Sequence, residues 1–153
     1  GDYAGTASAA KTLVEGIRLE LERRLPPSDV TVEQLRNRSW WSGPEIYIVV
    51  DDFDMIEGNN NPLKPLVPFL AQAADIGLHV IIARRAAGIG RSSYEPVLQG
   101  LKDAGANGIL LSGDRQEGQV WPGVYLQRLP AGRANWVDKS GKKHLVQLAF
   151  YPE

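Results

Sequence analysis

The feature that most constrains the fold is an unbroken run of apolar residues at 46–50, followed directly by Asp51 and Asp52. The run is β-branched and aromatic, and polar residues do not alternate with apolar ones. This pattern is typical of a strand that is covered on both faces in a parallel sheet. Similar runs occupy residues 78–83 and 109–111. We therefore expect these three segments to be neighbouring parallel strands of one sheet, each of them buried.

Four segments are predicted to be helical. Apolar residues recur at helical spacing over residues 7–24, and Pro26 ends that helix because proline cannot continue the ladder of backbone hydrogen bonds. Residues 31–38 open with a sequence typical of a capping box and predict a short helix. An apolar segment at 66–74 predicts a third helix, and residues 94–101 predict a fourth.

The last third of the chain favours antiparallel strands. Residues 124–126, 134–137 and 145–150 are predicted strands, and the polar residues 138–143 predict a hairpin turn between the last two. Strands that alternate with helices predict an α/β fold with three layers, a mainly parallel sheet and a small antiparallel patch at its end. A length of 153 residues suits a single domain, residues 1–153.

Composition excludes several classes of function. The net charge is −1, so no excess of positive charge indicates nucleic acid or an anionic membrane as a partner. Cysteine is absent, and the only imidazoles belong to His79 and His144, which argues against a zinc site. No apolar run is long enough to span a membrane, and we see no signal peptide at the start of the sequence.

Asp51 and Asp52 are the first candidate site residues, because open α/β sheets bind ligands at the carboxyl ends of their strands. In one interpretation they form a Walker B element, in which Asp51 holds Mg²⁺, usually through water, and Asp52 polarises the attacking water. In the other they only form a turn together with Asp54, since aspartate after a strand is a common turn former. The local pattern leaves both interpretations open.

A longer series of motifs resembles the FtsK/SpoIIIE family of ATPases, and within it the EccC-type ATPases of type VII secretion systems. The segments that carry the likeness are residues 38–44, 49–54, 61–63, 75–85 and 110–115. The resemblance implies a P-loop-NTPase-like, RecA-like core, of which residues 1–153 would be the C-terminal part of a single module, the last in its protein. The strand order of the family places the three apolar runs in one sheet, so a structure with any of them in a helix, or in separate sheets, would end the assignment.

The sequence departs from an active ATPase of this family at the phosphate site. It contains no Gly-x-x-x-x-Gly-Lys-[Ser/Thr] motif, and residues 88–93 imitate one without its lysine. Asp52 stands where active translocases usually carry glutamate. The resemblance implies ATP and Mg²⁺ for the complete module, with Asp51 holding the metal through the nucleotide. For residues 1–153 alone we expect neither a bound cofactor nor turnover.

Arg84 and Arg85 end the second apolar run, on the sheet edge where Asp51 is expected. A guanidinium group suits planar oxyanions, so one interpretation is a sensor near the γ-phosphate or a contact to a neighbouring subunit. The other is a pair of surface arginines that balance the charges of Asp51, Asp52 and Asp54.

The resemblance also implies a partner. In EccC-type proteins the last module would bind the C-terminal signal peptide of a WXG-type secreted substrate and couple this to export, beside other modules and subunits at the cytoplasmic face of the plasma membrane. Candidate pocket residues are Val97, Leu98 and Leu101, for which ordinary core packing is the alternative. Nucleic acid is not expected. Two other functions stay open: an FtsK-type DNA translocase motor domain and a degenerate, non-catalytic oligomerisation scaffold.

Overall fold

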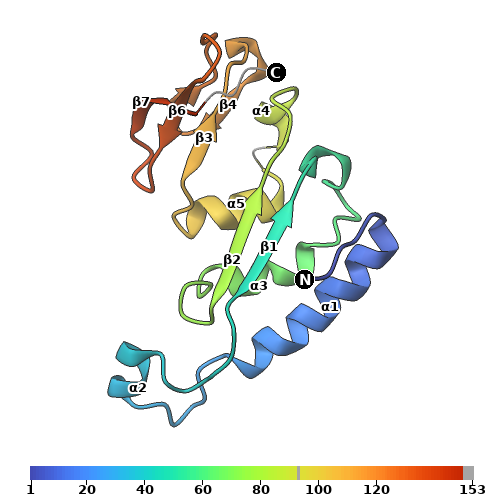
Figure 1. Ribbon diagram of the computed structural model, residues 1–153, viewed down its shortest axis with the longest axis vertical. Helices are drawn as coiled ribbons and strands as arrows, with labels where there is room; N and C mark the ends of the chain where they lie inside the picture. The colour runs from blue at the N-terminus through green and yellow to red at the C-terminus, as the bar shows by residue number, and fades with distance from the viewer. Residues whose placement is uncertain (93, 150–153) are drawn as a thin grey trace. The chain divides into compact units, whose positions relative to one another are not determined.

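A computed structural model of the chain describes residues 1–92 and 94–149 and divides it into two compact units, Gly1–Arg84 and Arg85–Glu153 (Figure 1). Each unit is described by itself below. Phe150, the last residue of the predicted strand at 145–150, lies outside the described residues.

The first unit begins with α1, Ala7–Arg23, as the apolar spacing predicts. Thr6 caps the helix, because its side chain accepts a hydrogen bond of 3.2 Å from the Ala9 amide, one of the donors that have no partner within the helix. Val14 and Leu21 bury the apolar face.

The predicted capping box opens α2, Val32–Asn37. The Thr31 hydroxyl accepts from the Gln34 amide, and the Gln34 side chain accepts from the Thr31 amide. The helix ends at Arg38, which adopts a left-handed conformation with φ 51°.

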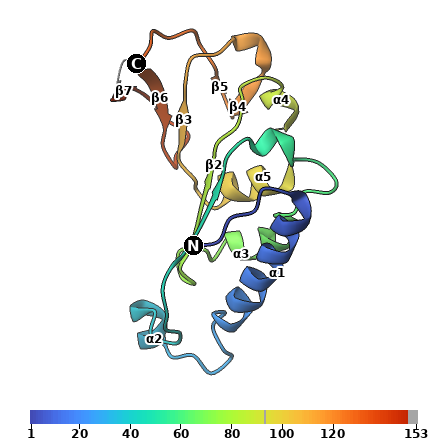
Figure 2. The same ribbon diagram turned by 45° about the vertical axis from the view of Figure 1, so that its right-hand side comes forward.

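Strands β1, Ile46–Val50, and β2, Leu78–Ile82, form a parallel pair in which Ile46 lies opposite Leu78. This part of the strand prediction is confirmed. Both α1 and the short helix α3, Val67–Leu70, lie on the same side of the pair (Figure 2). The buried apolar residues of this unit are Val14, Leu21, Phe53, Leu63, Leu66, Phe69, Leu70, Ile76 and Leu78.

The prediction that both strands are buried on both faces is wrong. Tyr47 is 63% exposed, Val49 71% and Ile81 55%, and burial in β1 alternates from residue to residue. Consecutive side chains of a strand point to opposite faces, so only one face of this pair packs on the core described above. The apolar run predicted a strand correctly, but it did not show how many of its faces the chain itself covers.

The apolar helix predicted at 66–74 is shorter than expected. A 3-10 turn at Lys64–Leu66 leads into α3, which ends at Leu70. Beyond it the bonds from Gln72 to the Phe69 carbonyl and from Ala73 to the Leu70 carbonyl span three residues, which is the tighter 3-10 pattern. Pro65 and Pro68 offer no amide hydrogen to an α-helical ladder through this segment.

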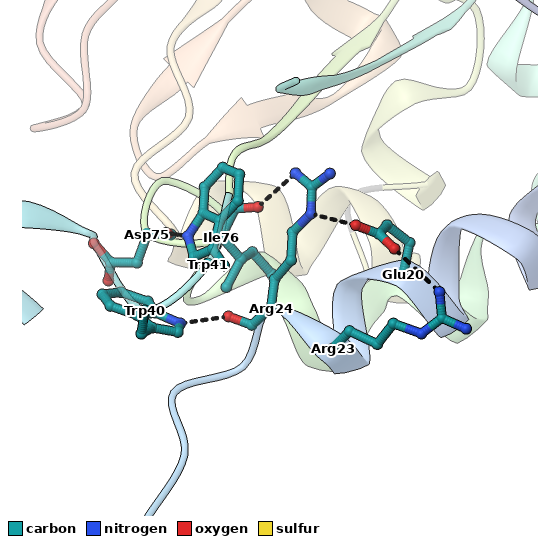
Figure 3. A network of polar contacts seen from close by, with 7 residues as sticks. All are labelled: Glu20, Arg23, Arg24, Trp40, Trp41, Asp75 and Ile76. Carbon is teal, nitrogen blue, oxygen red and sulfur yellow. Dashed lines mark hydrogen bonds and ion pairs between the residues drawn. The ribbon is translucent and has the colours of Figure 1, made fainter. Parts of the chain in front are cut away.

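A buried arginine joins the end of α1 to the start of β2 (Figure 3). Arg24 is 3% exposed; its Nε donates to Glu20 at 3.0 Å and its Nη1 to the Ile76 carbonyl at 3.3 Å. The guanidinium carbon lies 4.5 Å from the ring centre of Trp41, and the Arg24 carbonyl accepts from Trp40 Nε1 at 2.7 Å. Both tryptophans therefore have structural partners within this unit.

Gly77 makes this close packing possible. Its φ is 69°, a conformation that glycine adopts without strain, and a Cβ placed there would lie 2.5 Å from the Trp41 ring. Trp41 Nε1 donates to the Asp75 carbonyl at 2.8 Å, which holds the indole over the glycine.

Within its described residues, 85–92 and 94–149, the second unit contains two short α-helices, α4 (Ile89–Ser92) and α5 (Pro96–Asp103). The strands of this described part form two antiparallel sheets. One has the order β3 (Gly108–Leu110), β6 (Arg133–Val137) and β7 (Lys143–Gln147), and the other pairs β4 (Gln119–Trp121) with β5 (Val124–Tyr125). Buried side chains from both sheets and from α4 form one hydrophobic cluster: Ile89, Leu110, Val120, Val124, Leu126 and Val137.

The prediction that residues 109–111 extend the parallel sheet is wrong. Strand β3 pairs with β6, with Ile109 opposite Trp136, and belongs to a different sheet from β1 and β2. Ile109 is exposed and Leu110 buried, so the strand has one covered face, as in an antiparallel sheet with one side toward solvent. A run of three apolar residues is too short to show this alternation in the sequence. The chain is thus α/β, and in the described residues parallel pairing is confined to β1 and β2.

Candidate functional site

The carboxylates of Asp51 and Asp52 lie where the sequence places them, directly after β1. Two backbone hydrogen bonds to Ala83, the residue after β2, fix the end of β1. Ala83 N donates to the Val50 carbonyl at 2.8 Å, and Phe53 N donates to the Ala83 carbonyl at 3.0 Å. Phe53 is fully buried and anchors the chain just beyond the two acids. The strand end is thus held by its two bonds to Ala83 and by the buried Phe53.

Asp52 adopts a left-handed conformation with φ 49°, which aspartate tolerates better than most side chains. Its amide donates to the Asp51 Oδ1 at 3.0 Å, so one oxygen of Asp51 caps its own turn. Both residues are exposed. The two residues thus form a turn, as the second interpretation requires. Their carboxylates are also accessible to a ligand, as the Walker B interpretation requires.

Arg84 has a partner that the sequence did not reveal. Its Nη1 lies 2.7 Å from the Glu57 Oε2, and its side chain is only 9% exposed. Glu57 follows the 3-10 turn η1, Phe53–Met55, so the ion pair ties the loop after Asp52 to the end of β2. Nothing in the local sequence distinguishes Glu57 from Asp54 as the partner, because the choice depends on how the η1 turn folds back. Arg85 is exposed and begins the second unit.

The residues present can supply one ligand to a magnesium ion. Across residues 1–92 and 94–149, no group of three or more histidine or acidic side chains is arranged to hold a metal. Mg²⁺ in nucleotide sites is usually bound by one or two carboxylates, with water and phosphate oxygens completing its octahedral shell. The exposed carboxylate of Asp51 fits that limited role, and the remaining ligands would have to come from the nucleotide and from water.

The three candidate pocket residues lie on α5. Val97 is buried, whereas Leu98 and Leu101 are half-buried. Glu95 caps the helix and accepts from the amides of Val97 and Leu98. Only the two leucines therefore offer apolar surface to a partner.

A hollow of about 490 Å³ lies beside the same helix. Its lining includes Gln99 and Lys102 from α5 and Trp121 from β4, with Lys102 Nζ 5.3 Å from the Trp121 ring centre. Leu98 and Leu101 are not among its lining residues.

The helices of the described residues include none that combines the length and the apolar character needed to cross a membrane.

The sequence resembles curated proteins of ESX secretion systems. It is 46% identical over 148 residues to the ESX secretion system protein EccC of Thermomonospora curvata, covering 97% of this chain and 11% of that protein. It is 45% identical over 151 residues to the ESX-4 secretion system protein EccC4 of Mycobacterium tuberculosis, covering 98% of this chain and 12% of that protein. The chain thus spans only about a tenth of the length of these relatives. No family model matches the sequence.

Solved structures show the same likeness in three dimensions. Thermomonospora curvata EccC (ATPases 2 and 3), in complex with a signal sequence peptide, matches with a TM-score of 0.91 and 45% identity, over 99% of this chain and 27% of that one. The cytoplasmic domain of the Type VII Secretion ATPase EccC from the same organism matches with a TM-score of 0.91 over 99% of this chain and 18% of that one.

Proposed function

Because the chain belongs to the EccC family of ESX secretion system ATPases, we propose that it is the C-terminal part of a single FtsK/SpoIIIE-like ATPase module, which binds the C-terminal signal of WXG-type secreted substrates and couples this binding to export. The observation that carries the proposal is the likeness, over 99% of the chain, to EccC ATPases solved with a signal sequence peptide.

In the complete module, ATP and Mg²⁺ would bind at the edge where β1 ends, in a three-layer P-loop arrangement with further parallel strands. Asp51 would hold the metal through the nucleotide, and Asp52, one methylene shorter than glutamate, would face the attacking water. Arg84 would act as a sensor only after leaving or sharing its bond to Glu57, and Arg85 would contact phosphate or a neighbouring subunit. The parent protein would work at the cytoplasmic face of the plasma membrane, beside its other modules and subunits.

The signal peptide would place its apolar side chains against α5. Leu98 and Leu101 are half-buried there, so a partner can cover their remaining surface, whereas Val97 is already part of the core. A short peptide buries little area, and one or two apolar anchors then dominate the binding energy, which suggests an affinity on the order of micromolar.

Fluorescence anisotropy with a labelled tail peptide of a WXG-type substrate tests the proposal. We expect saturable binding that a scrambled peptide does not reproduce. The substitutions Leu98→Ser and Leu101→Ser should each weaken binding, by roughly tenfold for an apolar anchor. The control is Gln99→Ala, an exposed position on the same helix that should bind as the unchanged chain does.

Each variant also needs a thermal melt by circular dichroism, so that lost binding is not confused with unfolding. Saturation by duplex DNA, with no response to the tail peptide, would overturn the secretion function in favour of a DNA translocase. Binding of neither ligand by the folded chain would favour a non-catalytic scaffold.

A further inference from the structure

The second unit contains a small hollow that no part of the proposed function uses. Its volume is about 370 Å³, which lies within the range of small-molecule sites. The charged and polar residues that line it are Asp114, Arg115, Gln127, Arg128 and Lys143, together with the ring of Tyr125. Three cations and one carboxylate give this lining a net charge of +2, whereas the whole chain carries −1.

The three cations come from separate segments, and each contacts another residue of the hollow. Arg115, in the 3-10 turn η3 (Arg115–Glu117), has its guanidinium carbon 4.3 Å from the ring centre of Tyr125. Arg128 Nη2 lies 3.2 Å from the Asp114 Oδ2. Lys143, at the start of β7, donates from Nζ to the Gln127 Oε1 at 2.9 Å.

The carboxylate does not neutralise this group. Asp114 is ionised, because the hydrogen bond from the Gln116 amide and then the one from Arg128 hold its pKa below the usual value. It therefore offsets one of three cations and leaves the other two charges uncompensated. The side chain of Arg128 is 86% exposed, so its remaining donors reach solvent and any ligand that enters.

Two glycines line the hollow. Gly113 packs closely on Leu126, since a Cβ there would lie 2.9 Å from the Leu126 Cδ1. Gly123, in the turn between β4 and β5, has φ 75° and no neighbouring atom within 4 Å of where a Cβ would stand.

We propose that this hollow binds a phosphate group, either as a free polyphosphate oxyanion or as the phosphate chain of a nucleotide. A phosphate carries up to two negative charges and three peripheral oxygens, and so matches two arginines and a lysine that converge from different segments. A carboxylate has one charge and two oxygens, which a single arginine fork satisfies. All residues that line the hollow belong to the second unit, whereas Asp51 belongs to the first.

Titration of the ¹⁵N-labelled chain with tripolyphosphate, followed by NMR, tests the proposal. We expect saturable shifts of the amides of residues 113–115 and 123–128, with a Kd on the order of 1 mM because the hollow is open and salt screens exposed charges. ATP without Mg²⁺ and adenosine are titrated in parallel. Equal binding of ATP and tripolyphosphate assigns a free oxyanion site, and tighter binding of ATP assigns a nucleotide. Adenosine alone shifting the same amides would overturn the phosphate assignment.

The variant Arg128→Gln combined with Lys143→Gln should weaken tripolyphosphate binding about fivefold or more, since it removes two of the three cations. Lys139→Gln combined with Lys142→Gln, which also removes two charges but lies outside the lining, is the matched control and should leave binding unchanged. Equal weakening by the control would show general charge attraction and overturn the site. Citrate binding as tightly as tripolyphosphate, or an absence of saturation, would also overturn it.

Discussion

Arg24 is the residue through which three segments of the first unit meet. Its side chain is buried, yet its three partners come from different parts of the chain: Glu20 on α1, the Ile76 carbonyl before β2 and the ring of Trp41. A buried cation without partners is costly in a protein, so these three contacts offset the desolvation of the guanidinium group.

Replacing this side chain with methionine should lower the free energy of unfolding by about 1–3 kcal/mol. Arg24→Met keeps the aliphatic stem but leaves the Ile76 carbonyl without its donor and removes the cation from the Trp41 ring. Glu20 stays partly solvated, so its loss of a partner adds little. Urea unfolding followed by tryptophan fluorescence measures the change.

The adjacent residue supplies the control for that measurement. Arg23 also approaches Glu20, at 3.5 Å, but its side chain is 78% exposed. Arg23→Met should change stability by less than about 0.5 kcal/mol, as is usual for surface ion pairs. Equal effects of the two substitutions would mean that the buried contacts of Arg24 contribute nothing beyond an ordinary surface charge.

At the scale of elements, the sequence correctly predicted the helices that begin at a recognisable capping residue. Helices α1 and α2 begin at side-chain caps that Thr6 and Thr31 provide, and these signals are visible within four residues. The length of α3 was predicted wrongly because the prediction gave too little weight to Pro65 and Pro68, which offer no amide hydrogen to a helical ladder. The partner of β3 was predicted wrongly because it depends on a distant contact: β6, more than twenty residues along the chain, pairs with β3.

The turn between β6 and β7 should make this hairpin sensitive to acid. The Asp138 carboxylate accepts from the Ser140 side chain, lies 2.9 Å from His144 Nε2 and accepts from the Lys142 and Ser140 amides, and these contacts lower its pKa. Since the folded-state pKa lies below the unfolded value of about 3.9, the stabilisation is complete above that pH and is lost as the pH falls through the folded-state pKa.

Asp138→Asn should therefore destabilise the chain at neutral pH, and the difference from the unchanged chain should shrink as the pH falls below about 4. Urea unfolding at a series of pH values measures this difference in stability, and hydrogen exchange of the β6 and β7 amides shows whether it arises in the hairpin. A difference that stays constant from pH 7 to pH 2 would show that the carboxylate charge has no part in the turn.

At the scale of the whole molecule, the candidate site was predictable in part. The position and exposure of Asp51 and Asp52 follow from the end of an apolar run, whereas the bond between Arg84 and Glu57 requires the fold of the η1 turn. The expectation that separate sheets would argue against the EccC family was also wrong, because relatives at 45–46% identity match nearly the whole chain although β3 lies outside the β1–β2 sheet.

ATP with Mg²⁺ should not bind this chain with micromolar affinity. The sequence contains no phosphate-binding lysine motif, and a Walker B acid holds its metal mainly through the nucleotide. Isothermal titration calorimetry should show no saturable heat at micromolar ligand, and Asp51→Asn should give the same trace. Micromolar binding of ATP with Mg²⁺ that Asp51→Asn abolishes would contradict this prediction. Such binding would differ from binding of phosphate at Arg128 and Lys143, which is weak and needs no metal.

The contact between Gly77 and the Trp41 ring has an evolutionary consequence. Any side chain at position 77 must adopt a positive φ and also displace the indole, so the two positions are epistatic. A replacement of Gly77 becomes tolerable only after Trp41 has become smaller, and that first step removes the indole bond to the Asp75 carbonyl and the ring over Arg24. Related sequences should therefore vary at positions 41 and 77 together. The single variant with a smaller residue at 41 should be less stable than both the present pair and the double variant.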